Sequence, residues 1–261
     1  MFDLAAPTII AALASGALVG LFLGSFGGGG SVLAAPLLLY VVGVDDPHVA
    51  IGTSAASVSA IALVGLIGHW RGGRVKWPCA IVFAGAGVLG AVLGSGLAKE
   101  VDGAVLLLGF AIAMSLIALS MFRKPAFAGD PEVHITPAIV LRLAPIGLVV
   151  GVAAGFFGIG GGFLIVPGLM LAAGMTMANA TASSLVSVAL FGAATSSNYA
   201  ISGLVDGRLL VLLLLGGAVG GVAGIGVSRL LADREQTARS LFAMMILAVA
   251  AYVAAQAATT L

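Results

Sequence analysis

The sequence is poor in charge, because its 261 residues include only 11 basic and 10 acidic side chains, while 61% of the residues are hydrophobic. A soluble domain usually carries charge on about a quarter of its residues, since its surface must be solvated. So little charge excludes an ordinary soluble protein. It indicates a chain that lies in a membrane.

Other scarcities exclude whole classes of function. The single cysteine, Cys79, rules out an intrachain disulfide, and three separated histidines supply no Cys/His metal site. Basic residues scattered over separate loops make no stripe that could neutralise nucleic-acid phosphates. Gly27–Gly30 lacks the Lys-Ser/Thr of a Walker A loop, and no histidine lies in the interior of a hydrophobic segment to activate a serine. We therefore predict no enzyme, no cofactor, no metal and no nucleic-acid partner.

Hydrophobic segments of sufficient length predict a polytopic all-α membrane protein. Eight of them reach the roughly 20 residues that a membrane-crossing helix needs. Two further runs, 31–44 and 161–174, are shorter and suit half-helices, which either turn back within the membrane or cross it. The predicted crossings are 7–26, 49–69, 77–98, 103–122, 138–157, 178–201, 208–228 and 239–259.

The two short runs occupy corresponding places in two halves of the chain. Laying Gly16–Gly43 over Gly147–Gly174, an offset of 131 residues, gives 12 identities in 28 positions. After a one-residue slip, an offset of 130 pairs Ser54 with Ser184 and continues into the later glycine-rich segments. We interpret the chain as two membrane repeats, 1–130 and 131–261, that form one transport unit. Each repeat holds a pair made of a glycine-broken helix and a short half-helix, followed by three crossings.

The loops predict how the two repeats are oriented, because basic residues gather on the cytoplasmic side of a membrane. Loops 69–77, 123–142 and 229–239 are rich in Lys and Arg and are placed inside. Loops 99–102 and 202–207 then fall outside, together with the N-terminus and the C-terminus. An odd number of crossings in each repeat turns the second upside down, so we predict two inverted repeats.

Runs of consecutive glycine break the helix at the same place in both repeats. Each glycine costs a helix about 1 kcal/mol relative to alanine. Broken backbone persists in hydrocarbon only where protein or a water-filled cavity satisfies its polar groups. The N–H groups that start the following half-helix favour an anion, and glycine lets the anion approach closely. The predicted substrate site contains Gly27, Gly28, Gly29, Gly30, Ser31, Gly158, Gly160, Gly161 and Gly162.

Glycines spaced four residues apart have a different interpretation. Small residues at this interval are typical of membrane helices that pack closely. We assign this packing role to Gly16, Gly20, Gly24, Gly147, Gly151 and Gly155.

Hydroxyl and amide side chains cluster after each short run. Spacings of three and four residues place several on one helix face, where they could donate hydrogen bonds to the oxygens of a sulfite or sulfonate. The alternative is that they hold neighbouring helices together. Because the cluster is duplicated beside the glycine breaks, the predicted site also includes Thr53, Ser54, Ser57, Asn179, Ser183, Ser184 and Ser187.

His69 begins a basic loop that contains Arg71, Arg74 and Lys76. It could act as a proton-linked switch, because imidazole titrates near physiological pH. We interpret it instead as an interfacial residue beside Trp70. The basic residues could attract anions to the cytoplasmic mouth, and we assign them first to membrane topology.

Three motifs recur in both repeats. The pattern Gly-x-x-x-Gly-x-x-x-Gly-x-x-Gly-x-Gly-Gly occupies 16–30 and 147–161 and is followed in each repeat by a proline six residues later. Ala-x-x-Thr/Ser-Ser occupies 50–54 and 180–184. Together these motifs resemble the TauE/SafE family of sulfite and organosulfonate exporters, over essentially the whole chain. The resemblance implies a secondary carrier of the bacterial inner membrane that moves small sulfur-containing anions, such as sulfite or sulfoacetate, outward.

We therefore expect an alternating-access exporter whose partners are a small anion and the lipid bilayer. The alternatives are a permease for another solute, such as an organic acid or a metal ion, and a channel-like membrane protein. The repeats differ at the breaks, since Gly28 corresponds to Ile159 and Ser31 to Gly162. The two ends of the site are accordingly expected to be non-equivalent.

Overall fold

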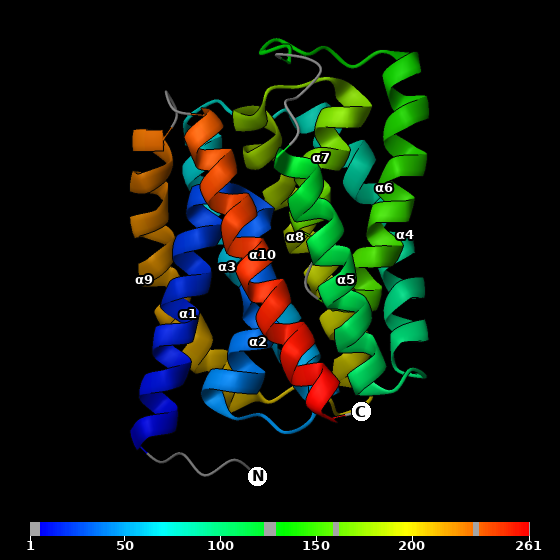
Figure 1. The fold of residues 1–261 in the computed structure, drawn as a ribbon. Coiled ribbons are helices and arrows are strands. Elements are labelled where there is room, and N and C mark those ends of the chain that lie inside the picture. Colours follow the sequence, from blue (N-terminus) through cyan, green and yellow to red (C-terminus); the bar gives the residue numbers. More distant parts are fainter. Residues whose placement is uncertain (1–5, 123–128, 159–161, 232–234, 261) are drawn as a thin grey trace.

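A computed structural model shows a bundle of helices that run roughly along one axis (Figure 1). The structure describes residues 6–122, 129–158, 162–231 and 235–260. Figure 1 shows α1 beginning at the lower end of the bundle and α6 beginning at the upper end. The elements are α1 (Ala6–Phe26), the 3-10 helix η1 (Gly27–Leu33), α2 (Ala34–Leu37), the π-helix η2 (Leu38–Val42), α3 (Pro47–Arg71), α4 (Trp77–Ala98), α5 (Gly103–Phe122), α6 (Pro137–Phe157), α7 (Gly162–Ala173), α8 (Met177–Ile201), α9 (Gly207–Leu231) and α10 (Glu235–Thr260).

Polar caps and glycines set the ends of these helices. The Asp46 carboxylate accepts a hydrogen bond from the His48 N–H at 2.8 Å, and Pro47 opens α3 with the φ that a first helical turn requires. Thr136 and Thr176 cap α6 and α8 in the same way. Several segments end at glycines with positive φ, which a side chain would disfavour: Gly43, Gly73, Gly174 and Gly203.

The predicted all-α class is confirmed, and within the part of the chain that the structure describes, six helical spans are long and apolar enough for a membrane crossing. These apolar spans are Ala6–Val42, Pro47–Arg71, Trp77–Ala98, Pro137–Phe157, Met177–Ile201 and Gly207–Ser228. Helices also stand at the predicted segments 103–122 and 239–259. There the apolar stretches that the structure describes are shorter, Gly103–Leu116 and Ala243–Gln256.

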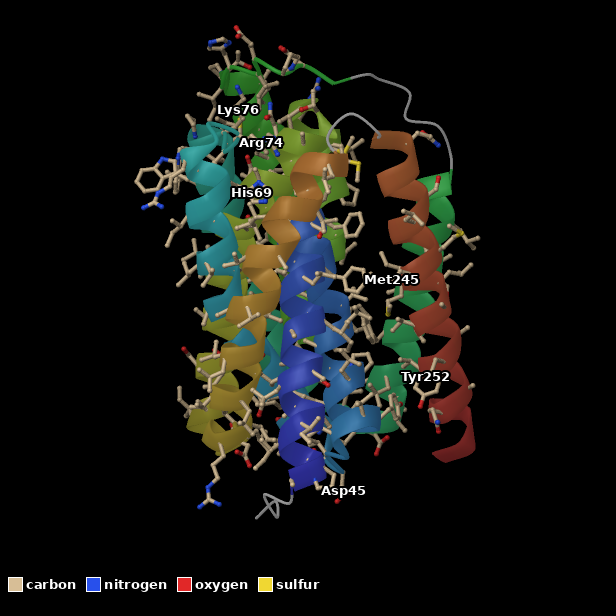
Figure 2. All side chains as sticks on the ribbon, turned by 90° about the vertical axis from the view of Figure 1, so that its left-hand side faces the viewer. Asp45, His69, Arg74, Lys76, Met245 and Tyr252 are labelled. Carbon is tan, nitrogen blue, oxygen red and sulfur yellow. The ribbon has the colours of Figure 1, made fainter. Side chains whose placement is uncertain are left out.

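Both short runs turn back toward the end from which the preceding helix came. After α1, the segment η1–α2–η2 returns the chain to Asp45, which lies at the lower end (Figure 2). After α6, α7 returns to the upper end, where the Asp130 N–H donates to the Gly174 carbonyl at 2.8 Å. Both runs therefore form return pairs with the helices that precede them.

Glycine stripes bring pairs of helices into backbone contact. The most extensive pairings join α1 to α9 and α4 to α6. A Cβ added to Gly24 would lie 2.5 Å from the Gly221 carbonyl oxygen, and one added to Gly147 would lie 2.5 Å from the Phe83 carbonyl oxygen. The packing role predicted for the glycines spaced four apart is confirmed. In both pairings the partner helix belongs to the other half of the chain.

The hydroxyl-rich helices α3 and α8 pack against each other inside the bundle. The Ser59 hydroxyl of α3 donates to the Ala189 carbonyl of α8 at 2.6 Å. A Cβ on Gly192 would lie 2.8 Å from the Ala55 carbonyl oxygen. Large apolar side chains are exposed on the surrounding helices, including Leu89, Leu93, Leu97, Leu215, Val219 and Val222. Hydroxyls inside and apolar side chains outside are what a lipid environment favours.

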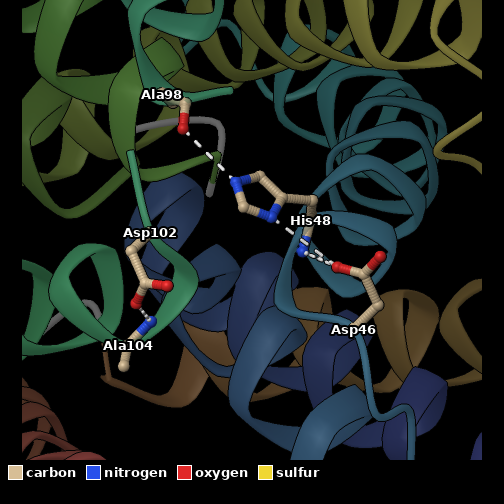
Figure 3. A network of polar contacts seen from close by, with 5 residues as sticks. All are labelled: Asp46, His48, Ala98, Asp102 and Ala104. Atoms are coloured by element: carbon tan, nitrogen blue, oxygen red, sulfur yellow. Dashed lines mark hydrogen bonds and ion pairs between the residues drawn. The ribbon is translucent and has the colours of Figure 1, made fainter. Parts of the chain in front are cut away.

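Charged side chains collect at the two ends of the bundle. At the lower end, His48 links α3 to α4, because its Nε2 donates to the Ala98 carbonyl at 3.3 Å (Figure 3). The other ring nitrogen, Nδ1, lies 3.6 Å from the Asp46 carboxylate. Arg74 and Lys76 lie at the upper end (Figure 2).

Candidate functional site

The first glycine run forms a tight turn between α1 and its return segment. Gly27 has a φ of 63°, in the left-handed region that glycine adopts readily. All residues of the following η1, Gly27–Leu33, are buried. The Ser31 hydroxyl donates to the Gly28 carbonyl at 2.7 Å. A Cβ on Gly30 would lie 2.7 Å from the Leu23 Cα, so this glycine lets η1 fold back onto α1.

Gly28 lies directly against Gly162, the first residue of α7. A Cβ on Gly28 would lie 2.8 Å from the Gly162 Cα and 2.6 Å from Val188 Cγ2. The Gly28 N–H donates to the Ser184 hydroxyl oxygen at 3.0 Å, and the Ser184 hydroxyl donates to the Thr181 carbonyl at 2.7 Å. The two glycine breaks and α8 therefore meet at one buried junction, which we call the glycine junction: Gly28, Gly162 and Ser184.

The second break places Gly158 against α3. Gly158 follows α6 with a φ of 66°, and a Cβ on it would lie 3.0 Å from the Ile51 Cβ. The Ile51 carbonyl accepts a hydrogen bond from the Ser54 hydroxyl at 2.9 Å. This arrangement repeats the packing of Gly27 against α8. Two predicted site residues lie outside the described part of the chain, Gly160 and Gly161.

Two of the predicted hydroxyls bind loops. The Thr53 hydroxyl accepts a hydrogen bond from the Asp206 N–H at 2.9 Å, and the Ser183 hydroxyl accepts one from the Lys76 N–H at 2.9 Å. Asp206 precedes α9 and Lys76 precedes α4. Each hydroxyl therefore anchors the start of a glycine-striped helix from the opposite half of the chain.

The remaining predicted side chains have different surroundings. Asn179 donates from Nδ2 to the Pro131 carbonyl at 2.9 Å. The Ser57 hydroxyl bonds back to the Ser54 carbonyl of its own helix at 2.9 Å. Ser187 is fully buried, and its hydroxyl has no hydrogen-bond partner among the described residues. Leaving a buried hydroxyl unpaired costs about 1–3 kcal/mol, so Ser187 is available to a ligand.

Among the residues in contact with the glycine breaks, two apolar ones were not predicted as site residues. Val188 contacts Gly28, and Ile51 contacts Gly158. Both are apolar and belong to no motif. The sequence gives one signal, since the offset of 130 pairs Ile51 with Thr181, whose carbonyl accepts the hydrogen bond from Ser184.

The chemistry of the glycine junction suits an anion. It offers backbone N–H and hydroxyl donors in a buried place, where low dielectric strengthens each hydrogen bond. Each Lys and Arg in the described part of the chain lies in a loop or within about two turns of a helix end. Binding at the junction would therefore depend on neutral donors. Over the same residues, no three His, Cys, Asp or Glu side chains gather as metal ligands do.

A small cavity opens at the upper end of α3. Its volume is about 70 Å³. The residues that line it are Gly68, His69, Gly72, Arg74 and Ile225. His69 is only 4% exposed, and its Nε2 donates to the Gly24 carbonyl at 3.2 Å, whereas Trp70 is exposed. The His69 side chain therefore packs inside the protein against α1, and its place at the membrane interface stays a prediction.

Comparison with known sequences finds relatives over nearly the whole chain. The family model described as sulfite exporter TauE/SafE matches residues 12–253. A probable membrane transporter protein of Xylella fastidiosa strain 9a5c is 46% identical over 251 residues, which cover 94% of this chain and 95% of the relative. One from strain Temecula1 is 44% identical over 247 residues, with 94% and 95% covered. Bacillus subtilis strain 168 has a probable membrane transporter protein, YdhB, 26% identical over 222 residues, covering 82% of this chain and 88% of the relative. No solved structure matches the chain.

Proposed function

Because this chain belongs to the sulfite exporter TauE/SafE family and is a multi-pass membrane transporter, we propose that it exports small sulfur-containing anions such as sulfite, sulfoacetate or related organosulfonates. It would act as a secondary carrier of the bacterial inner membrane, working by alternating access. The observation that carries this proposal is the glycine junction, where Gly28 lies against Gly162 beside the Ser184 hydroxyl.

We place an oxygen of the bound anion between the Gly28 N–H and the Ser184 hydroxyl, where it would accept from both. The Gly28 N–H that now donates to the Ser184 hydroxyl would turn to the substrate. Ser187 lies three residues further along the same helix, on the same face, with its hydroxyl unpartnered among the described residues. Sulfite and sulfonate groups each present three oxygens. One N–H and two hydroxyls can therefore bind them without a buried cation.

The closeness of Gly28 and Gly162 explains why transport requires movement. Their backbones touch, so an anion can enter only when η1 and α7 separate. Because glycine has no side chain, a small separation gives an oxyanion direct access to backbone N–H groups. We assign the opening of the site to rocking of one repeat against the other.

We propose that the two halves of the chain, divided at residue 130, are inverted repeats. Corresponding residues make corresponding bonds, as in the pairs Thr53 with Asp206 and Ser183 with Lys76, both at 2.9 Å. The corresponding helices α1 and α6 begin at opposite ends of the bundle (Figure 1). Both observations support the inversion.

We assign the upper end of the bundle to the cytoplasm and both termini to the outside. The upper end carries Arg74 and Lys76, and the lower end carries Asp45 (Figure 2). Basic residues favour the cytoplasmic face. The beginning of α1 and the end of α10 both lie at the lower end (Figure 1).

Proteoliposomes that contain the full-length protein and labelled sulfite test the proposal. We expect saturable release, faster than from protein-free vesicles. Ser184→Ala should slow this release about ten-fold, since a hydrogen bond to a charged group is worth about 1.5–3 kcal/mol. Ser196→Ala is the matched control on the same helix, because the Ser196 hydroxyl only bonds back to Ala193.

The control should release sulfite at the wild-type rate. Release of sulfite and sulfoacetate no faster than from protein-free vesicles would overturn the proposal. Transport of a metal cation or of a sulfur-free organic acid in their place would do the same.

A further inference from the structure

We propose that the cavity at the upper end of α3 is a second anion site, in which Arg74 binds a small oxyanion before it reaches the glycine junction. The class of anion rests on the proposed function. Three features point to the site itself: the cavity, an arginine with no ion-pair partner in the part of the chain that the structure describes, and a difference between the two repeats.

The cavity has the size and charge that a small oxyanion needs. Its volume is about 70 Å³, and a cavity needs roughly 10–15 Å³ in the same measure to hold one water, so it has room for several waters or one small oxyanion. Arg74 is half-buried on its wall and forms no ion pair with a carboxylate among the described residues. A guanidinium in a partly buried place favours a planar or tetrahedral oxyanion that accepts two hydrogen bonds.

The other repeat shows what fills the corresponding place. At the offset of 130 residues, Gly68 corresponds to Asn198 and Gly72 to Ser202. At the lower end, the Lys99 ammonium donates to Asn198 Oδ1 at 2.8 Å and to the Ser202 hydroxyl at 3.0 Å. These side chains close the lower position with a polar network. At the upper end, two glycines take their places. The Ile225 side chain lies against Gly68, where an added Cβ would be 2.5 Å from its Cδ1, and the cavity is lined by these glycines, Ile225, His69 and Arg74.

α3 and α8 end in the same kind of turn, but different side chains meet at the two turns. The Arg74 N–H donates to the His69 carbonyl at 3.3 Å, and the Leu204 N–H donates to the Tyr199 carbonyl at 3.0 Å. Such a helix end is usually accompanied by an apolar contact. Tyr199 and Leu204 belong to one hydrophobic cluster and provide it. The upper turn has His69 and Arg74 there instead, and both line the cavity. The charge of the Arg74 guanidinium is what an anion there would stabilise.

One wall of the cavity is hydrogen-bonded to α1 just before the first glycine break. The His69 ring that forms part of its wall donates to the Gly24 carbonyl at 3.2 Å. Gly24 lies three residues before Gly27, where α1 turns into η1. An anion held by Arg74 therefore waits beside the segment that leads to the glycine junction.

Protection of a cysteine in the cavity tests binding without any transport measurement. In a Cys79→Ala background, Gly72→Cys places a thiol on the wall, and a Cβ there lies an ordinary 3.4 Å from the His69 carbonyl oxygen. The probe is sodium sulfate, compared with sodium gluconate at equal ionic strength, because gluconate is too large for the cavity. At a sulfate concentration about four times its Kd, we expect labelling by N-ethylmaleimide to slow about five-fold.

Two arginine variants show whether the cavity or the general surface charge is responsible. Arg74→Gln should abolish the protection. Arg71→Gln is the matched control, since Arg71 is an exposed arginine of the same loop, and it should keep the protection. Equal protection in both variants, equal loss in both, or no protection in the parent would overturn the inference, since diffuse surface charge does not distinguish the two positions.

The protection test of the second anion site can succeed or fail independently of the transport test of the proposed function. If sulfate protects Gly72→Cys through Arg74 but no sulfur anion crosses the membrane, the anion site stands and the proposed transport fails. If labelled sulfite is transported and no protection is seen, only the second site fails.

Discussion

Gly28 and Gly162 touch through their backbones, since a Cβ on Gly28 would lie 2.8 Å from the Gly162 Cα. The contact joins the two glycine breaks, one from each half of the chain. The Gly28 N–H is held by the Ser184 hydroxyl at 3.0 Å. Any side chain at this point would both separate the breaks and cover the donor that we assign to the substrate.

Gly28→Ala is expected to reduce sulfite release in proteoliposomes by about ten-fold or more, and to destabilise the protein by the about 1–3 kcal/mol typical of overpacking. The added methyl meets the Gly162 backbone and Val188, and the backbone is the part that cannot give way. Gly85→Ala is the control, because a Cβ on Gly85 has nothing within 4 Å. Normal release by Gly28→Ala would contradict a substrate site at the glycine junction.

Gly147→Ala should lower the thermal unfolding midpoint in detergent. Its methyl would lie 2.5 Å from the Phe83 carbonyl oxygen, so α6 and α4 must move apart along the glycine stripe. We expect a loss of about 1–3 kcal/mol. For comparison, Gly226→Ala on α9 meets nothing within 4 Å. It should leave the midpoint unchanged or raise it, because alanine favours a helix over glycine by about 1 kcal/mol. Equal midpoints for the two variants would show that the stripe does not limit stability.

Thr53→Val is expected to destabilise the protein, whereas Thr53→Ser should not. The valine has nearly the same shape but cannot accept the hydrogen bond that the Asp206 N–H donates at 2.9 Å. An N–H left unpaired costs about 1–3 kcal/mol. The comparison of thermal midpoints isolates the hydroxyl, because serine keeps it. If valine and serine behave alike, the Asp206 N–H finds another partner, such as water.

The sequence predicted the features that depend on composition and spacing. Low charge and long apolar segments were enough to predict a helical membrane protein. The four-residue spacing of the glycines that begins at Gly16 and at Gly147 was enough to predict close helix packing. The duplicated motifs pointed to Gly28 and Gly162 as parts of one site, and the structure brings these two residues together.

Other features depend on tertiary pairing, which spacing does not reveal. Nothing in the hydroxyl clusters distinguishes Ser184, which binds Gly28, from its neighbour Ser183, which binds the loop at Lys76. His69 could not be recognised as buried, because its environment is made by Gly24 of another helix. The upper cavity is lined by residues that lie far apart in the sequence, such as Gly68 and Ile225, and no sequence motif marks such a space.

The inverted orientation predicts that the loops after α3 and α8 lie on opposite faces of the membrane. In a Cys79→Ala background, Arg71→Cys and Gly207→Cys report on them, since both positions are exposed and a Cβ on Gly207 has nothing within 4 Å. The reagent is a membrane-impermeant maleimide, added to spheroplasts, which lack the outer membrane but keep a sealed inner membrane. It should label Gly207→Cys at once. It should label Arg71→Cys only after permeabilisation, because the basic loop is expected in the cytoplasm.

The Cys79→Ala parent has no cysteine, so its labelling gives the background for both single-cysteine variants. Labelling of both variants from the same side would contradict the inversion, and it would remove the symmetry on which rocking between two states depends. Labelling of Arg71→Cys alone in intact cells would keep the inversion but reverse the assigned faces. The upper cavity, with Arg74 on its wall, would then open to the outside. It would hold the anion after the glycine junction and not before it.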